Sequence, residues 1–282
     1  LRLTDVLNTG SSKVKLNGGL LAIDNDTTLA SSILHLAAST LEITQTKTLT
    51  YEGASIEIGA SALSINGGGT FTNTNPLELD NAASQINLSG ISANYIRTDS
   101  NSLGITVDNS STVNEFSVGH VTPVSISPNQ ILNGSFKIYR GTEYSNLQLN
   151  NTGTLAANVT ISGNGGTVEA QKSMTFTGSL QQVDQHDGFE LIIASGETMN
   201  YSGSEFDIGS HTFKLSGGGT FNNTKNITLD NSGSKLAISD STKISHLLVS
   251  ASNTNGGLTI SSSVSSSTGN LVENLSLRDS FY

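Results

Sequence analysis

The sequence predicts an all-β fold, a right-handed parallel β-helix (β-solenoid) with about 22 residues per coil. Three observations support this prediction: apolar residues in short alternating pairs, polar turn residues between the pairs, and a long internal repeat. Only 13% of the 282 residues are charged, while Leu, Ile, Val and Phe recur at short intervals throughout. A chain of this kind contains enough regularly spaced apolar residues to bury a core.

Pairs of apolar residues separated by one polar residue run along most of the chain, as at Ile56/Ile58 and Leu236/Ile238. This alternation is typical of a strand with one buried face. Gly, Asn, Asp, Ser and Thr lie between the pairs and favour turns. Between residues 34 and 77 successive pairs begin about 7 or 8 residues apart, so three strand-and-turn units make the predicted coil.

Two antiparallel β-sandwich domains are the competing architecture, because they also combine short strands with polar turns. Sandwich strands usually contain about five or six residues, and their turn signals recur about every 8–12 residues. The apolar stretches in this chain are shorter and more closely spaced. The solenoid is therefore the favoured prediction.

The internal repeat consists of residues 51–81 and 201–231, which align without a gap at an offset of 150 residues. Of the 31 aligned positions, 14 are identical. The identical positions include a Gly-Gly-Gly-Thr-Phe segment that begins at Gly67 and again at Gly217. Such agreement predicts two copies of one structural unit.

Three regions follow from the repeat. We expect a first solenoid copy at 1–116, an irregular junction or insertion at 117–146, and a second copy at 147–282 stacked continuously on the first. The junction contains Pro123 and Pro128, two of the three prolines in the chain. Proline has no N–H group to donate to a strand ladder, so we expect the interior coils largely to lack it.

Residues 28–43 have two interpretations. They form an amphipathic helix with Leu29, Ile33, Leu36 and Leu41 on one face, or they form two alternating strands. Both stay open at the level of sequence.

The glycine-rich segments do not predict a phosphate site. They lack the Lys-Ser/Thr of a P-loop and the strand-to-helix context of a dinucleotide fingerprint. We expect each to form a tight corner that only Gly fits. The Leu-Asp-Asn segments that begin at Leu79 and Leu229 are interpreted in the same way, as strands that run into turns.

Parallel β-helices include enzymes that cleave polysaccharides, and these need clustered acids in one groove. This chain has four widely separated Arg residues, no Asp-Asp pair and no Gly-His-Gly segment. We predict that it is not an enzyme and expect no catalytic, cofactor-binding or metal residues and no cofactor. The densest titratable group is Asp184, His186, Asp187 and Glu190, which is interpreted as a solvated loop rather than as a general base or a metal site.

Three weaker signals have ordinary explanations. The Asp24-Asn25-Asp26 segment has oxygen ligands for calcium but lacks the glycine and final Glu of an EF-hand. Alternating threonines suggest an ice-binding face, but Thr50 and Thr72 become Asn at the 150-residue offset, and the β propensity of Thr explains the runs. The Asn-X-Ser/Thr sequons arise by chance in so polar a chain.

The net charge and the short apolar stretches limit the classes of partner that we expect. A net charge of −10 with 13 scattered Lys and Arg residues argues against nucleic acid, and the short apolar stretches argue against membrane insertion. The sequence has no cysteine, and residues 1–7 lack the features of a signal peptide. We therefore interpret the chain as a processed product or as a segment of a longer protein.

The segments at 65–81 and 214–231 resemble the repeat regions of autotransporter passengers and filamentous-haemagglutinin-like adhesins. This resemblance implies a β-helix displayed outside the bacterial cell or on its surface, and it carries over no functional residue. The expected function is that of an extracellular structural and adhesive module of a larger surface protein, which binds a glycan or a protein through its exposed coil faces. End-to-end self-association is a further expected contact. The alternatives are a self-assembling filament or sheath subunit and a polysaccharide-active lyase or glycosidase.

Overall fold

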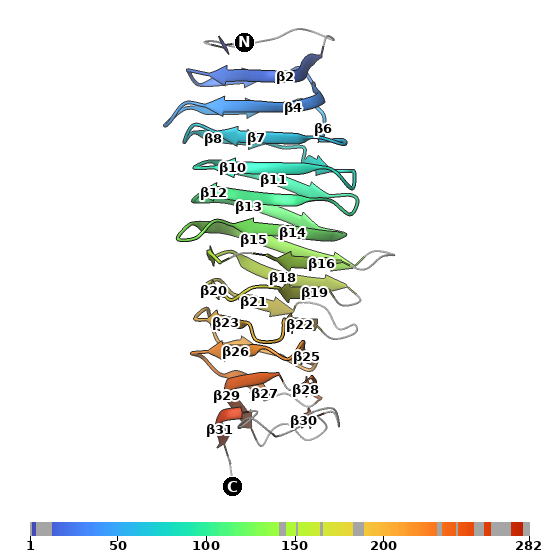
Figure 1. Cartoon of the computed structure of the whole chain (residues 1–282), viewed down its shortest axis with the longest axis vertical. Coiled ribbons are helices and arrows are strands. Elements are labelled where there is room, and N and C mark those ends of the chain that lie inside the picture. Colours follow the sequence, from blue (N-terminus) through green and yellow to red (C-terminus); the bar gives the residue numbers. More distant parts are fainter. Residues whose placement is uncertain are drawn as a thin grey trace.

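In the computed structural model the chain winds into a column of stacked turns, with the first and last described strands at opposite ends (Figure 1). The structure describes residues 2–3, 13–140, 145–150, 152–163, 166–182, 189–229, 233–240, 242–250, 257–260 and 272–278. Within these ranges every regular element is a β-strand. The prediction of an all-β parallel solenoid with about 22 residues per coil is confirmed.

One face of the column is a 13-stranded sheet in which each strand belongs to a successive turn. Its strands pair in parallel throughout. They are β1 (Arg2–Leu3), β2 (Val14–Ile23), β4 (Ile33–Ile43), β7 (Ala62–Asn66), β10 (Gln85–Ser89), β12 (Gly104–Asn109), β14 (Val121–Ile126), β16 (Asn146–Leu149), β19 (Thr167–Ala170), β22 (Phe189–Ile193), β25 (Thr212–Ser216), β28 (Lys235–Ile238) and β30 (Gly257–Ile260).

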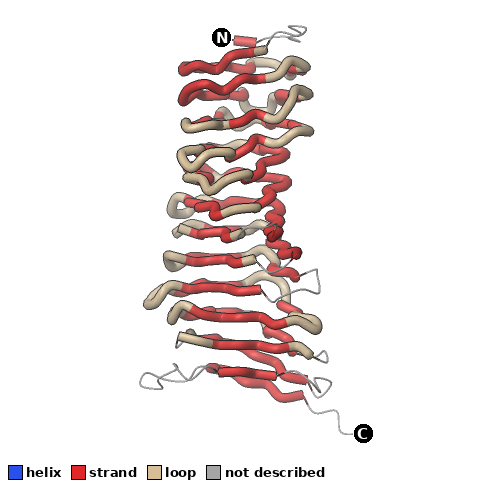
Figure 2. Tube along the Cα trace, turned by 90° about the vertical axis from the view of Figure 1, so that its right-hand side faces the viewer, coloured by secondary structure: helices blue, strands red, loops and turns tan. Residues whose placement is uncertain are grey.

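The other faces are built from shorter strands, which merge into longer ones in the middle of the column. Figure 2 shows the strands in red, stacked above one another, with the tan turns at the corners. These strands are β3 (Thr27–Leu29), β5 (Thr48–Tyr51), β6 (Ile56–Glu57), β8 (Thr70–Asn73), β9 (Leu77–Leu79), β11 (Ser92–Thr98), β13 (Ser111–Val118), β15 (Ile131–Arg140), β17 (Thr154–Leu155), β18 (Asn158–Gly163), β20 (Met174–Phe176), β21 (Leu180–Gln182), β23 (Thr198–Tyr201), β24 (Phe206–Asp207), β26 (Thr220–Asn223), β27 (Ile227–Leu229), β29 (Lys243–Ser250) and β31 (Val272–Arg278).

Strand β11 shows how two faces join. Its first residues pair with β8, and its last residues, Ile96 to Thr98, pair with β9. Between these pairings Asn94 and Tyr95 both point outward, although Ala93 and Ile96 on either side are buried. Two consecutive outward residues bend the strand, so a single strand covers two faces of the coil.

The apolar pairs form the core, as the alternation predicts. Leu41, Ile65, Leu88 and Val107 occupy successive turns in register, and each is at most 1% exposed. Because one coil is too small to bury its own apolar face, this stacking of coils supplies the core.

The 150-residue repeat corresponds to a whole number of turns. Ile65 in β7 and Leu215 in β25 are equivalent residues, and seven steps separate their strands in the sheet order. Dividing 150 residues by seven turns gives about 21 residues per turn. The two copies of the repeat therefore lie in the same orientation along the column.

The glycine segments form tight corners, which confirms the prediction made for them. Gly67 has a φ of 102° and Gly217 has a φ of 97°, and residues that carry a Cβ atom rarely adopt this backbone conformation. A Cβ atom on Gly69 would lie 2.6 Å from the carbonyl oxygen of Lys47 in the previous turn. At Gly69 the backbones of two successive turns thus approach each other too closely for any side chain.

Residues 28–43 form two strands, so the strand interpretation holds and the helical one does not. They lie in β3 and β4, where His35 is buried and Leu36 is 50% exposed. A helix with Leu36 in its apolar face would have buried that side chain.

The expected junction at 117–146 contains two regular strands. Strands β14 and β15 pair in parallel with the strands of the turns before and after them. Pro123 lies inside β14, opposite Gln148, so this interior coil accommodates a proline. Residues 141–144 lie outside the described ranges.

Candidate functional site

A hollow with an aromatic wall lies where β11 and β13 bend between faces. It measures about 400 Å³ and is lined by Thr74, Asn94, Tyr95, Asn114 and Glu115. We call it the Tyr95 groove. Each turn contributes outward residues from its bend, and register places Glu115 directly beside Tyr95.

Tyr95 differs from the other aromatic residues whose burial the structure describes. The rest, such as Tyr51, Phe71 and Phe116, are at most 1% exposed, whereas Tyr95 is only half-buried. Within the described part of the chain its phenol Oη has no hydrogen-bond partner. The ring is therefore open to a ligand on its outer side.

The buried side chain of Asn73 holds the backbone of Tyr95 in place. Its Nδ2 donates to the Tyr95 carbonyl oxygen at 2.7 Å, and its Oδ1 accepts from the Tyr95 N–H at 3.1 Å. Asn73 is fully buried, so these bonds are shielded from water. The bend that presents Tyr95 is consequently a fixed feature of the backbone.

Two amides extend the polar lining beside Tyr95. Asn94 Nδ2 donates to the Asn73 carbonyl oxygen at 2.8 Å, and Asn114 Nδ2 donates to Asn94 Oδ1 at 3.2 Å. The ladder fixes both amides and leaves Asn114 Oδ1 directed to solvent without a partner among the described residues. Such a group accepts hydrogen bonds from a ligand.

The charges near the groove are paired. Lys137 Nζ lies 2.8 Å from Glu115 Oε2, and Arg97 Nη2 lies 2.6 Å from Glu78 Oε1. Both pairs link neighbouring turns, and the Lys137–Glu115 pair is largely exposed. Salt screens such surface pairs, so they orient side chains more than they stabilise the fold.

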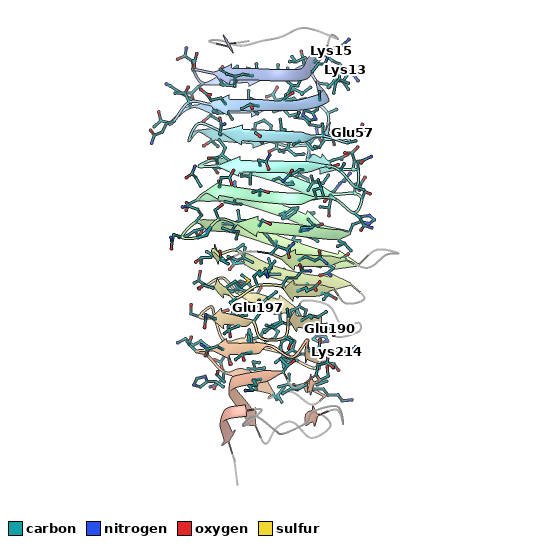
Figure 3. All side chains as sticks on the ribbon, viewed as in Figure 1. Lys13, Lys15, Glu57, Glu190, Glu197 and Lys214 are labelled. Atoms are coloured by element: carbon teal, nitrogen blue, oxygen red, sulfur yellow. The ribbon has the colours of Figure 1, made fainter. Side chains whose placement is uncertain are left out.

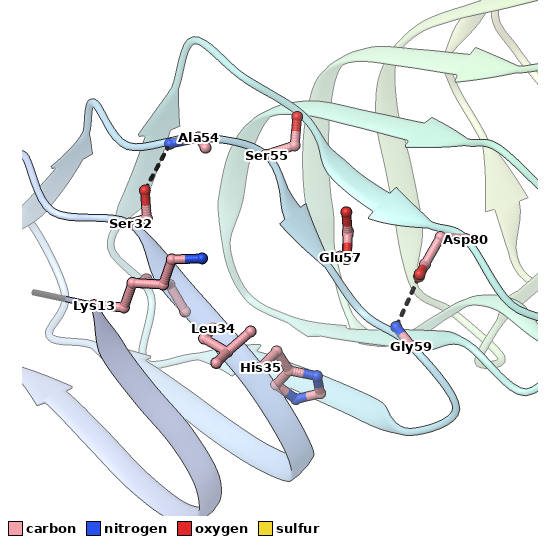
Figure 4. Close-up of a pocket in the computed structure, with 10 residues that line it drawn as sticks. Lys13, Ser32, Leu34, His35, Ala54, Ser55, Glu57, Gly59 and Asp80 are labelled. Atoms are coloured by element: carbon pink, nitrogen blue, oxygen red, sulfur yellow. Dashed lines mark hydrogen bonds between the residues drawn. The ribbon is translucent and has the colours of Figure 1, made fainter.

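A second hollow of about 230 Å³ lies at a corner near the N-terminal end, beside β4 and β6 (Figure 4). Lys13 reaches toward it from one side, while Glu57 and Asp80 stand on the other. Asp80 Oδ1 accepts the N–H of Gly59 at 2.7 Å, and Ser32 Oγ accepts the N–H of Ala54 at 3.4 Å.

His35 forms part of that corner hollow. Its Nδ1 lies 2.9 Å from the carbonyl oxygen of Ile58, which can only accept, so the proton sits on Nδ1. Ser84, from the turn on the other side, donates its Oγ to the neighbouring Gly59 carbonyl oxygen at 2.9 Å. Nε2 of His35 is buried and has no hydrogen-bond partner among the residues that the structure describes. The His35 ring therefore donates a hydrogen bond to the backbone at this corner.

A third hollow of about 270 Å³ lies along the glycine corners, from Gly68 to Asn133. Beside it, Thr48 and Thr50 pair in register with Thr70 and Thr72. The next turn presents Ser92 at the first position and Asn94 two residues later. Thr28 of the turn before pairs with Thr50, so threonines occupy three successive turns at one position and two at the other. The β propensity of Thr accounts for such short runs.

The titratable group predicted from sequence is described only at Glu190. Asp184, His186 and Asp187 lie outside the described residues. Glu190 lies in β22, opposite Lys214 of β25, and accepts a hydrogen bond from Ser216 Oγ at 2.8 Å (Figure 3). These contacts account for Glu190 as a polar residue on the outside of the sheet.

The acids of the Asp24-Asn25-Asp26 segment make contacts with the next turn. Asp24 Oδ1 accepts from Thr44 Oγ1 at 3.2 Å, and Asp26 Oδ1 accepts the N–H of Thr48 at 2.8 Å. Across the ranges that the structure describes, no three His, Cys, Asp or Glu residues gather as a metal site.

Glu197 accepts two hydrogen bonds from Ser173. The Ser173 hydroxyl, 2.6 Å from Glu197 Oε2, and the Ser173 N–H both hold its pKa below the ordinary value. Ser173 lies one turn earlier than Glu197. The contact links two turns at the surface and faces none of the three hollows.

Sequence reasoning missed Tyr95. The signal was present, because Asn94-Tyr95 and Asn114-Glu115 are two adjacent polar or aromatic residues that interrupt strict alternation one turn apart. Their assembly into one groove depends on the register between turns, which sequence spacing alone does not specify.

The chain matches no family model, no curated protein and no solved structure. Over the described ranges it forms no helix of the length and apolar character that a membrane span requires.

Proposed function

We propose that this chain is an extracellular structural and adhesive module of a larger bacterial surface protein. In this proposal the solenoid is a rigid column, and its exposed coil faces bind a glycan or a protein. No catalytic step is part of the proposed function. A 13-stranded sheet with strands about 4.8 Å apart extends about 58 Å, which separates the outer coils from an attachment point.

The proposal is supported by which residues of the repeat are identical in the two copies and which differ. Residues identical in both copies serve the backbone and the core: Tyr51 Oη donates to the Ala54 carbonyl oxygen at 2.7 Å, and Tyr201 Oη donates to that of Ser204 at 2.8 Å. Gly53 is required beside Tyr51, because a Cβ atom there would lie 2.5 Å from the phenol oxygen.

Several outward residues at equivalent positions differ between the copies, although the exposed Thr74 and Thr224 are identical. Ser64 is replaced by Lys214, and Thr72 is replaced by Asn222. A repeat that keeps its scaffold and varies its surface is suited to display, since each face of the column then presents different chemistry. An enzyme groove repeated in both copies would instead keep its outward residues.

An array of printed glycans and immobilised matrix proteins tests the proposal. The folded chain should bind a subset of them, and an Ile65→Asp variant, which places a carboxylate in the core, should lose that binding together with its β-sheet circular dichroism. Failure of the wild-type chain to bind any target, or equal binding by the unfolded variant, would contradict the proposal.

A further inference from the structure

The Tyr95 groove combines three features that suit a sugar. It has one half-buried aromatic ring, amide groups fixed by hydrogen bonds, and a hollow of about 400 Å³. A Tyr ring presents a rigid apolar face against which the C–H face of a pyranose packs, and polar groups around it fix orientation. We propose that the Tyr95 groove binds an uncharged polysaccharide, with one sugar ring stacked on Tyr95. This inference rests on the proposed adhesive function.

The lining favours a sugar over a protein partner. Protein interfaces place several buried apolar or aromatic anchors in a dry centre. The Tyr95 groove offers one aromatic side chain, and Thr74, Asn94, Asn114 and Glu115 make up the rest of its wall. Closely spaced hydroxyl groups of a sugar match these donors and acceptors, whereas a protein surface would leave many of them unpaired.

Charge decides between classes of polysaccharide. Glu115 is the charged residue of the lining, and Lys137 is already paired with it. The chain as a whole carries a net charge of −10. Because Lys137 offsets the charge of Glu115, the net negative charge of the chain is what would repel a polyuronate or a sulfated glycan, whereas a neutral glycan meets no such repulsion. Glu115 Oε1 is then available to accept from a sugar hydroxyl.

The geometry assigns roles to individual residues. Tyr95 provides the stacking face, and Asn114 Oδ1 accepts from a hydroxyl of the stacked sugar. Asn73 acts as a positioning residue, because its two bonds to the Tyr95 backbone hold the ring outward. Thr74, from the turn before, borders the groove on the side opposite Glu115.

Affinity electrophoresis through gels that contain a soluble neutral β-glucan, a neutral galactomannan or a polyuronate tests this inference with the full chain. The wild-type chain should be retarded by at least one neutral polymer and not by the polyuronate. Tyr95→Ala should weaken retardation about tenfold, which corresponds to about 1.4 kcal/mol. Tyr95→Phe should retain most of the affinity, because it keeps the stacking face.

Asn222→Ala is the matched control for Asn114→Ala. Both are exposed amides whose Nδ2 donates to an Asn one turn earlier, at 2.8 Å for Asn222 and 3.2 Å for Asn114. Asn114→Ala should weaken binding about threefold, about 0.7 kcal/mol, and Asn222→Ala should leave it unchanged. Circular dichroism confirms that each variant is folded.

The outcomes separate this inference from the proposed function. Wild-type binding that survives Tyr95→Ala would overturn the Tyr95 groove as the site and leave the adhesive function standing. Equal retardation by the polyuronate would overturn the assignment of an uncharged ligand. Retardation by no polymer, with binding to a protein on the array, would overturn the sugar inference alone, and binding to nothing would overturn both.

Discussion

Substituting Asn223 measures how much the hydrogen bonds of a buried side-chain amide contribute to the free energy of unfolding. Its side chain is 1% exposed and makes four hydrogen bonds to backbone groups. Nδ2 donates to the carbonyl oxygens of Lys225 at 2.6 Å and His246 at 2.7 Å, and Oδ1 accepts the N–H groups of Ser245 at 3.1 Å and His246 at 3.0 Å. One amide thus ties the bend of its own strand to the next turn.

We expect Asn223→Ala to lower the free energy of unfolding by about 4 kcal/mol, since each of the four bonds contributes about 1 kcal/mol net. The neighbouring Asn222→Ala is the control, because Asn222 is exposed in the same strand and its loss should cost less than about 1 kcal/mol. Equilibrium urea denaturation, followed by circular dichroism and by tyrosine fluorescence, gives both values.

Agreement between the two probes is needed, because a column of stacked turns can lose cooperativity at a weakened turn. If Asn223→Ala and Asn222→Ala shift the urea midpoint equally, the amide bridge contributes nothing net and the reasoning fails. Asn73→Ala should repeat the effect at the equivalent position. The effects of Asn73→Ala and Asn223→Ala should add, because seven turns separate the two sites.

Three further outcomes are expected. Gly69→Ala should destabilise the chain by about 1–3 kcal/mol in urea denaturation, because its Cβ would lie 2.7 Å or less from backbone oxygens of the preceding turn, and a loss below about 0.5 kcal/mol would contradict this. Burial raises the pKa of Tyr51 and Tyr201 above 10, so folding stability present below pH 10 should fall as pH rises through the raised values. Absorbance near 295 nm should then show two phenols ionising only with unfolding, and early titration of all six Tyr residues would refute it. The pKa of Glu197 is lowered in the fold, so its contribution to folding stability is present above the ordinary carboxyl pKa and is lost as pH falls through the lowered value. Glu197→Gln should therefore reduce the difference in Tm between pH 7 and pH 3. An unchanged difference would refute the role of Ser173.

Sequence reasoning predicts the fold well because the local pattern and the stacking agree. Ile56 and Ile58 point inward as the alternation requires, and both are at most 1% exposed. The spacing of 7 or 8 residues corresponds to the three faces of one coil. At Leu36 the local pattern fits both a helix and a strand, and only pairing with neighbouring turns decides between them.

The Tyr95 groove was beyond sequence reasoning for a physical reason. Its lining comes from three successive turns, and the turns differ in length: Ala93 pairs with Phe71, 22 residues earlier, and with Val113, 20 residues later. Small differences of this kind decide which outward residues become neighbours. The average spacing of apolar pairs does not resolve these differences in turn length. It therefore predicts the stacked coils but not which outward residues become neighbours.

The whole-turn length of the repeat has a mechanical consequence. Because 150 residues complete seven turns, removing or duplicating one unit leaves the strands on both sides of the cut in matching register. Each such event changes the reach of the column by about 34 Å and leaves its cross-section unchanged. Unequal recombination within the gene would therefore change the length of the column in fixed increments, with no new fold to be evolved at either junction.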